Sequence, residues 1–175
     1  MKTSTDCKAA YRAKETAMTK HKIVLTGADH DRLQSLLESE FAQVISPIEY
    51  IEDLRVELGG AEVVPPNRVP RSVVTMNSTV TLRDLDTNER ETYTLVYPEH
   101  ADIANDRLSV LAPVGTAILG QRVGDEVTWR VPAGWRRLRV QRILFQPERE
   151  GMLEAELDTP PPKWIRNIGA MAEAP

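Results

Sequence analysis

The sequence predicts an α+β fold, in which a short antiparallel helical hairpin precedes a mainly antiparallel β domain with one short helix. Two observations predict it. Between residues 28 and 58, apolar residues recur at the three- and four-residue spacing of amphipathic helices. From Ser72 onward the period shortens to two and β-branched residues dominate. A chain of 175 residues has room for one main core with appendages.

The first helix is expected over residues 28–39. Thr26 and, three residues later, Asp29 form a capping pattern just ahead of it. The leucines of the stretch LQSLL then repeat at helical spacing, so this helix has one apolar side to bury.

The second helix is expected in SPIEYIEDLRVELGG. Ser46 is placed as its N-cap, Pro47 as its first residue and Glu49 to complete a capping box. Its apolar residues form one stripe, and two glycines end it. With residues 40–45 as the connecting loop, the two helices should pack as an antiparallel hairpin over residues 23–60.

The β domain is expected over residues 73–147. Residues 61–72 include three prolines in AEVVPPNRVP and are predicted to be a linker. VVTMNSTVTLRDL and ETYTLVYP then form a hairpin around the turn DTNER, and RLSVL is a third strand. APVGTAILG is a short helix, and EVTWRVP and WRRLRVQRILF are two more strands that turn at Ala133 and Gly134.

The two ends of the chain are predicted to be tails. Residues 1–22 hold six Lys or Arg and two acidic residues, with little to bury, so we expect a basic disordered tail. Residues 148–175 are acidic and then broken by prolines, so we expect a flexible tail with one labile helix.

Composition narrows the classes of function. The net charge of −4 disfavours direct DNA contact, because phosphate binding requires a cationic surface, and it favours a protein partner. Cys7 is the single cysteine, so no internal disulfide can form. No apolar run approaches the ~20 residues that cross a bilayer. We therefore expect a cytoplasmic protein with no membrane contact.

The glycine-rich stretch PVGTAILGQRVGDEV does not predict catalysis. Gly115 and Gly120 have the spacing of a phosphate loop, but Gln and Arg follow where such a loop requires Lys and Ser or Thr. Asp125 and Glu126 are neighbours at a strand start, so they point to opposite faces. The three histidines lack metal-ligand spacing. The residues alone thus predict no catalytic group, metal, cofactor or small-molecule substrate.

The β-domain sequence resembles the C-terminal domain of the bacterial transcription elongation factors GreA and GreB. The motifs VVTMNS, TLVYP, LSVLAPVGTAILG and VGDEV occur in order and are most similar to the Rnk branch of that family, which is named for regulation of nucleoside diphosphate kinase. Upstream, VLTGADHDRLQSLL resembles the first coiled-coil helix of the superfamily. The resemblance implies an FKBP-like α+β domain preceded by a truncated coiled coil.

The resemblance also implies a partner, namely RNA polymerase near the rim of its secondary channel. The segment that docks in the Gre proteins matches LSVLAP here, so Ser109, Leu111 and Pro113 are the expected polymerase-binding residues. Leu111 replaces an aspartate of the Gre segment and would have to supply an apolar contact. Leu111 and Val114 can equally be core residues, and the sequence leaves this choice open.

Gre factors hold magnesium with acidic residues at the coil tip and promote transcript cleavage. The second helix here covers about 13 residues, or about 20 Å, so it should not reach the polymerase active centre. The implied function is a non-enzymatic regulator that competes with Gre factors. Glu38 and Glu40 lie near the expected tip, and an active cleavage factor is the alternative. A third, an FKBP-like peptidyl-prolyl isomerase, is disfavoured because aromatic residues make up only 5% of the chain.

Overall fold

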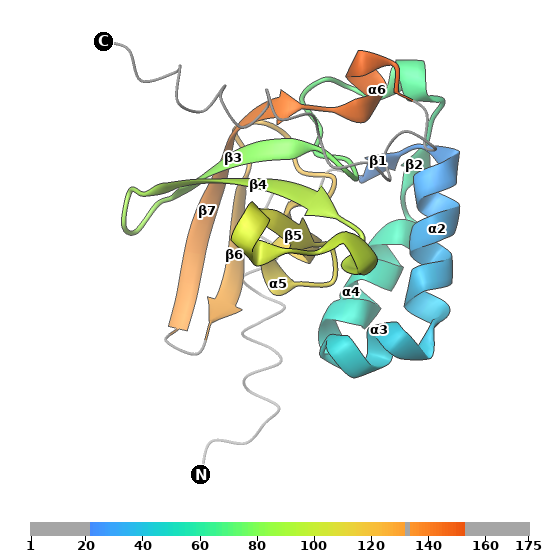
Figure 1. Ribbon diagram of the computed structural model, residues 1–175, viewed down its shortest axis with the longest axis horizontal. Helices are drawn as coiled ribbons and strands as arrows, with labels where there is room; N and C mark the ends of the chain where they lie inside the picture. Colours follow the sequence, from blue (N-terminus) through green and yellow to red (C-terminus); the bar gives the residue numbers. More distant parts are fainter. Residues whose placement is uncertain (1–21, 132–133, 153–175) are drawn as a thin grey trace.

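The computed structural model describes residues 22–131 and 134–152, and most of both predicted tails lies outside these ranges. Its helices are α2 (Gly27–Glu38), α3 (Glu40–Ile45), α4 (Ile48–Gly59), α5 (Pro113–Ile118) and α6 (Pro147–Glu150), with short 3-10 helices η1 (Pro66–Arg68), η2 (Pro98–His100) and η3 (Ile103–Asn105). Its strands are β1 (Val24–Leu25), β2 (Glu62–Val63), β3 (Thr79–Asp84), β4 (Arg90–Val96), β5 (Arg107–Ser109), β6 (Glu126–Val131) and β7 (Gly134–Phe145). Helices α2, α3 and α4 lie together on one side, and the large sheet lies on the other (Figure 1). Within the described ranges, no helix is long and apolar enough to cross a membrane.

Helix α2 begins where the sequence predicts, because Thr26 caps it. The Thr26 side chain accepts a hydrogen bond from the Asp29 backbone N–H at 3.1 Å. Leu33 and Leu37, one turn apart, are fully buried and place the apolar side of the helix against the core. The helix ends at Ser39, whose extended backbone breaks the helical path.

Residues 40–45, expected as a loop, form helix α3 instead. Ser39 ends α2 and also caps α3 by accepting a backbone hydrogen bond from it. Ser46 is not the N-cap of α4, because Pro47 holds that position without a side-chain hydrogen bond. The Ser46 hydroxyl donates instead to the carbonyl oxygen of Leu111 at 3.0 Å. A tertiary contact thus takes the hydroxyl that local capping would use.

The predicted proline-rich linker contains a strand. β2 pairs in parallel with β1, with Glu62 opposite Val24, and the Val64 N–H donates to the carbonyl oxygen of Leu25 at 2.9 Å. The prolines that follow allow only the single turn η1. This pairing ties the end of α4 back to the start of α2.

The large sheet has the strand order β5-β4-β3-β7-β6, and all its pairs are antiparallel except β4 with β5. β3 begins at Thr79, later than the sequence indicated, because Asn77 takes a left-handed conformation with φ of 59°. Asn88 does the same in the turn between β3 and β4. The turn expected at Ala133 and Gly134 falls partly outside the described residues.

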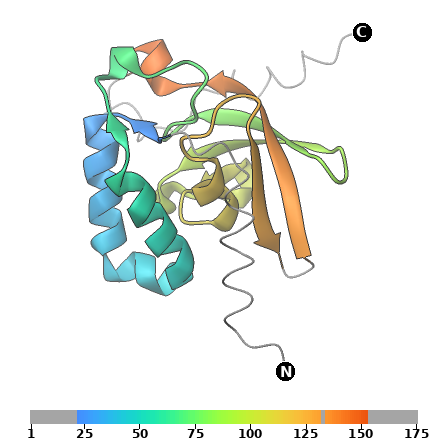
Figure 2. The ribbon, with the colours of Figure 1, turned by 180° about the vertical axis from the view of Figure 1, so that it is seen from behind.

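One hydrophobic core serves both the helices and the sheet. It includes Leu33 and Leu54 from the helices together with Leu82, Leu95 and Val140 from the sheet. Helices α2 and α4 run side by side and cover one end of the sheet when the molecule is seen from behind (Figure 2). Two helices of 12 residues each have too little surface between them to bury their apolar sides alone, so they depend on the sheet.

Helix α5 approaches the end of β5 so closely that only glycine fits at one position. A Cβ atom on Gly115 would lie 2.0 Å from the carbonyl oxygen of Ser109, well inside contact distance. The Thr116 hydroxyl donates to the Val110 carbonyl oxygen at 2.7 Å and holds the same approach. The packing of α5 therefore fixes the path of the chain after β5.

Gly115→Ala is expected to lower the free energy of unfolding by at least about 2 kcal/mol, because the new methyl group meets a backbone atom that cannot move away cheaply. Chemical denaturation measures the loss. Gly59→Ala is the matched control, since nothing lies within 4 Å of its added Cβ, and it should be neutral or stabilising by up to about 1 kcal/mol. Equal stability of the two variants would contradict the close approach.

The predicted C-terminal tail, residues 148–175, begins with helix α6, which is packed on the body. The buried Gln146 side chain donates to two backbone carbonyls of the loop before β3. One residue into α6, the Thr75 hydroxyl donates to Glu148 Oε2 at 2.9 Å. Burial raises the pKa of Glu148, and the nearby Asp29 carboxylate adds to the rise in pKa.

Glu148→Gln is expected to raise the melting temperature at neutral pH but not below pH 4.5, the ordinary pKa of the group. Because the pKa is raised in the fold, the folded protein holds a proton that the unfolded chain releases, and stability falls as pH rises through this window. The amide cannot ionise and still accepts the Thr75 hydrogen bond. Thermal unfolding of both proteins checks this, and a lower melting temperature of the variant at neutral pH would contradict it.

Candidate functional site

The predicted binding segment, residues 109–113, lies at one edge of the large sheet. It begins with Ser109, the last residue of β5, which is the strand at the end of the sheet order. Ser109 Oγ accepts from the Leu111 N–H at 3.2 Å, and the Ser109 carbonyl oxygen accepts from the Ala112 N–H at 3.0 Å, so the chain turns tightly. Pro113 then opens α5, a position at which its missing N–H costs nothing.

The three predicted binding residues are not equally accessible. Ser109 and Pro113 are half-buried and reach the surface. Leu111 is 3% exposed and belongs to the hydrophobic core. Its side chain therefore cannot supply the apolar surface contact expected of it while the core is intact. Of the two readings that the sequence left open for Leu111, the structure selects the core.

The two acidic residues expected at the tip, Glu38 and Glu40, lie where α2 meets α3. Both are exposed and flank Ser39. In the part of the chain that the structure describes, no three His, Cys, Asp or Glu side chains are grouped so that they could hold a metal ion. This end of the molecule thus presents acidic side chains to solvent without assembling them into a metal site.

A hydrogen bond joins the helices to the 109–113 segment. Ser46, between α3 and α4, is 5% exposed and donates to the Leu111 carbonyl oxygen. On the other side of α4, the Arg55 guanidinium donates to the carbonyl oxygen of Leu37 at 3.0 Å and ties α4 to the end of α2. The turn between α3 and α4 is consequently held beside the 109–113 segment.

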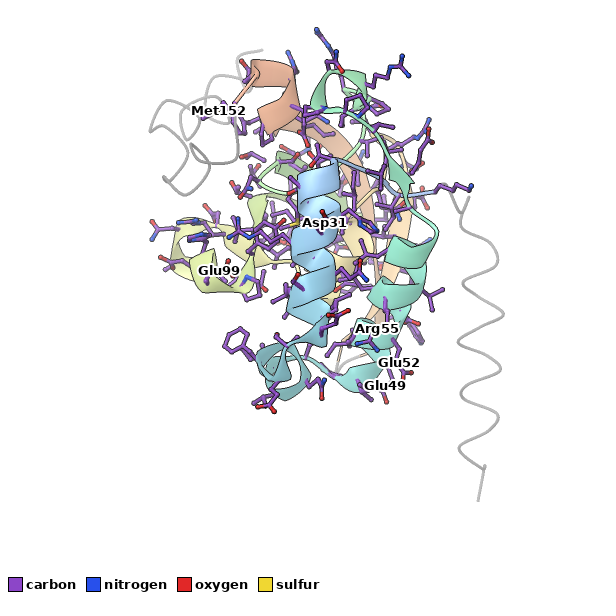
Figure 3. The ribbon with its side chains drawn as sticks, turned by 90° about the vertical axis from the view of Figure 1, so that its right-hand side faces the viewer. Asp31, Glu49, Glu52, Arg55, Glu99 and Met152 are labelled. Atoms are coloured by element: carbon purple, nitrogen blue, oxygen red, sulfur yellow. The ribbon has the colours of Figure 1, made fainter. Side chains whose placement is uncertain are left out.

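A second link, which the sequence analysis missed, joins α2 to the chain that follows β4. The Tyr97 hydroxyl donates to the Asp29 carboxylate at 2.9 Å. The Arg32 guanidinium lies 4.0 Å from the centre of the Tyr97 ring and pairs with Glu99 at 2.7 Å. Figure 3 shows Glu99 beside α2. No local pattern could reveal this group, because Asp29 and Tyr97 are 68 residues apart.

The Arg32–Glu99 pair also affects the pKa of Glu99. Partial burial alone would raise the pKa of Glu99, but the hydrogen bonds from its own backbone amide and from Arg32 outweigh burial and lower the pKa. Glu99 is therefore ionised at neutral pH and keeps its partner.

Comparison with known proteins shows to which family this chain belongs. Residues 69–145 match the family described as "Transcription elongation factor, GreA/GreB, C-term". The chain is also 41% identical over 135 residues to the regulator of nucleoside diphosphate kinase of Escherichia coli (strain K12), which covers 77% of this chain and 97% of that protein. The chain belongs to the GreA/GreB family. The resemblance and the α+β fold that the sequence indicated are both confirmed.

Other GreA/GreB family members show how much of the chain is shared. GreA of Thermodesulfovibrio yellowstonii is 33% identical over 96 residues, which is 55% of this chain and 61% of that GreA. A solved structure, the prokaryotic transcription elongation factor GreA/GreB from Nitrosomonas europaea, matches with a TM-score of 0.60 and 42% identity, over 71% of this chain and 98% of its own. The match thus covers nearly the whole length of the regulator and of the Nitrosomonas europaea factor, but 61% of the Thermodesulfovibrio yellowstonii GreA.

Ser46→Ala is expected to lower the free energy of unfolding by about 1 kcal/mol, because it removes the hydrogen bond to the Leu111 carbonyl from a buried site. Urea denaturation measures the change. Ser35→Ala is the control, since Ser35 is exposed on α2 and its hydroxyl bonds only within its own helix, to the Asp31 carbonyl oxygen. A Ser46→Ala variant no less stable than Ser35→Ala would show that the link contributes nothing.

Proposed function

We propose that this protein is a non-enzymatic transcription regulator of the Rnk type that binds RNA polymerase near its secondary channel and competes there with Gre factors. The observation that carries the proposal is the extent of similarity. The match covers 97% of a protein named as a regulator, but 61% of a GreA. A polymerase partner implies that the protein acts in the cytoplasm.

The proposed contact is the 109–113 segment. It lies at a sheet edge with Ser109 and Pro113 at the surface, and Gly115 and Ser46 fix its backbone from both sides. A segment whose conformation is already fixed loses little entropy on binding, which favours affinity. Leu111 contributes to this site by anchoring the segment in the core.

We propose no cleavage activity because the helices are short. Helices α2 and α4 have 12 residues each, so each is about 18 Å long, and α2 is packed along the body. Glu38 and Glu40 therefore stay close to the domain that docks. The alternative, an active cleavage factor, is favoured by the exposure of these two acidic residues at the far end of the helices.

Binding is tested with the full chain and purified core polymerase. We expect wild-type protein to bind at micromolar concentration and GreB to displace it. Pro113→Asp should weaken binding about tenfold, since it puts a charge into the contact while Asp remains well suited to the first turn of a helix. Ile103→Asp is the matched control, because Ile103 is 65% exposed and precedes the opposite end of β5. Failure of the wild-type protein to bind would refute the proposal.

The cleavage alternative is decided in stalled elongation complexes, where we expect no stimulation of transcript cleavage. Stimulation that Glu40→Ala abolishes would show that the tip does reach the active centre and that the second function is the correct one.

A further inference from the structure

We infer that α3 and the start of α4 form a second docking surface, which binds an apolar area of RNA polymerase edged by Lys or Arg side chains. This inference rests on the proposed function and extends it from one segment to two. The surface consists of four apolar residues, here called the tip patch: Phe41, Val44, Ile45 and Ile48.

The tip patch is exposed to a degree that packing does not explain. Phe41, Ile45 and Ile48 are 51%, 52% and 51% exposed, and Val44 is 85% exposed. Within α3, the residue that packs into the core is Ala42, which is fully buried. Single exposed apolar residues are ordinary, but four within eight positions form a patch of the kind that marks an interaction site.

The fold itself does not require these side chains. Phe41, Val44 and Ile45 lie at the three- and four-residue spacing that places them on one side of α3. β-branched and aromatic residues are weaker helix formers than Ala, Glu or Lys, so a six-residue helix would be stabilised by polar residues here. α3 lies at the end of the helical unit that is remote from α6 (Figure 1), and each of these three side chains is more than half exposed.

The charge around the tip patch indicates what covers it. Residues 38–54 contain five acidic residues and no Lys, Arg or His. Glu38, Glu40, Glu49 and Glu52 are exposed, and Figure 3 shows Glu49 and Glu52 next to each other on the outer side of α4. The nearest cation along the chain is Arg55, which is engaged with a backbone carbonyl.

The acidic residues around the tip patch indicate which kind of partner can cover it. A second copy of this chain would bring two acidic borders together, and like charges across an interface are unfavourable. A partner with an apolar centre and a basic border meets both the apolar residues and the carboxylates. The negative charge of residues 38–54 therefore favours a different protein over self-association.

The tip patch continues the 109–113 segment. Ser46 lies between Ile45 and Ile48 in the chain, and its hydroxyl donates to the Leu111 carbonyl oxygen at 3.0 Å. A partner that contacts Ser109 or Pro113 thus has the patch within reach of the same surface. Two adjoining contacts on one rigid body give a larger interface than the short segment alone.

The test compares patch and control variants of the full chain for binding to purified core polymerase. The double variant Val44→Ser, Ile48→Ser should bind about tenfold more weakly, as expected when exposed apolar anchors lose their contact. Val56→Ser is the matched control, because Val56 is 70% exposed on α4 but outside the patch, and it should bind like wild type. Glu40→Lys with Glu49→Lys should also weaken binding, and this loss should shrink at high salt.

The outcomes separate this inference from the proposed function. If wild-type protein and the double variant bind polymerase equally, the tip patch is not a docking surface, although the 109–113 contact stands. If wild-type protein does not bind, the proposed function itself fails. A wild-type dimer in light scattering that the double variant converts to a monomer would overturn the choice of partner, since the patch would then bind a second copy.

Discussion

The hydrogen bond between Tyr97 and Asp29 fixes how the helices sit on the sheet. Asp29 is 6% exposed, and a carboxylate at such a site is tolerated only with hydrogen-bond donors around it. The Tyr97 hydroxyl and the Thr26 hydroxyl both donate to it, one from the residue directly after β4 and one from the cap of α2. Rotation of α2 away from the sheet would break the hydrogen bond from Tyr97 to the Asp29 carboxylate. These contacts hold the start of the helical unit in place, and the ion pair between Arg32 and Glu99 adds a further contact at the surface.

The start of the helices is held in place, and their apolar sides lie in the common core. The far end of the helical unit, at α3, is therefore also held in place. Ser46 completes the arrangement by tying the turn between α3 and α4 to the Leu111 carbonyl. A longer coiled coil could project from the sheet domain as a separate arm, but these helices bury their leucines in the core that they share with the sheet. The short helical unit is thus packed on the sheet domain, with the turn between α3 and α4 held beside the 109–113 segment.

Charge is divided unevenly between the helical unit and the sheet. Residues 23–60 contain eight acidic residues and two arginines, whereas β7 carries four arginines and no acidic residue. Three of these arginines pair across the sheet with Asp84, Asp86 and Glu126, so the sheet is locally neutralised. The acidic residues of the tip have no comparable set of cations nearby in sequence. The overall charge of −4 therefore understates the negative potential at the tip.

The sequence by itself determined the elements whose signals are local. Thr26 as a cap, the alternating residues of β3 and β4 and the family motifs around LSVLAP were all readable, because capping, periodicity and motif order act over a few residues. The tertiary structure alone decided the use of Ser46 and the burial of Leu111. The Ser46 hydroxyl bonds to a residue 65 positions away, and this contact competes with local capping. The burial of Leu111 follows from its place in the common core, which no short pattern records. The tip patch was likewise hidden, since residues 40–45 were expected to be a loop, and only the tertiary structure shows a helix there with exposed apolar residues.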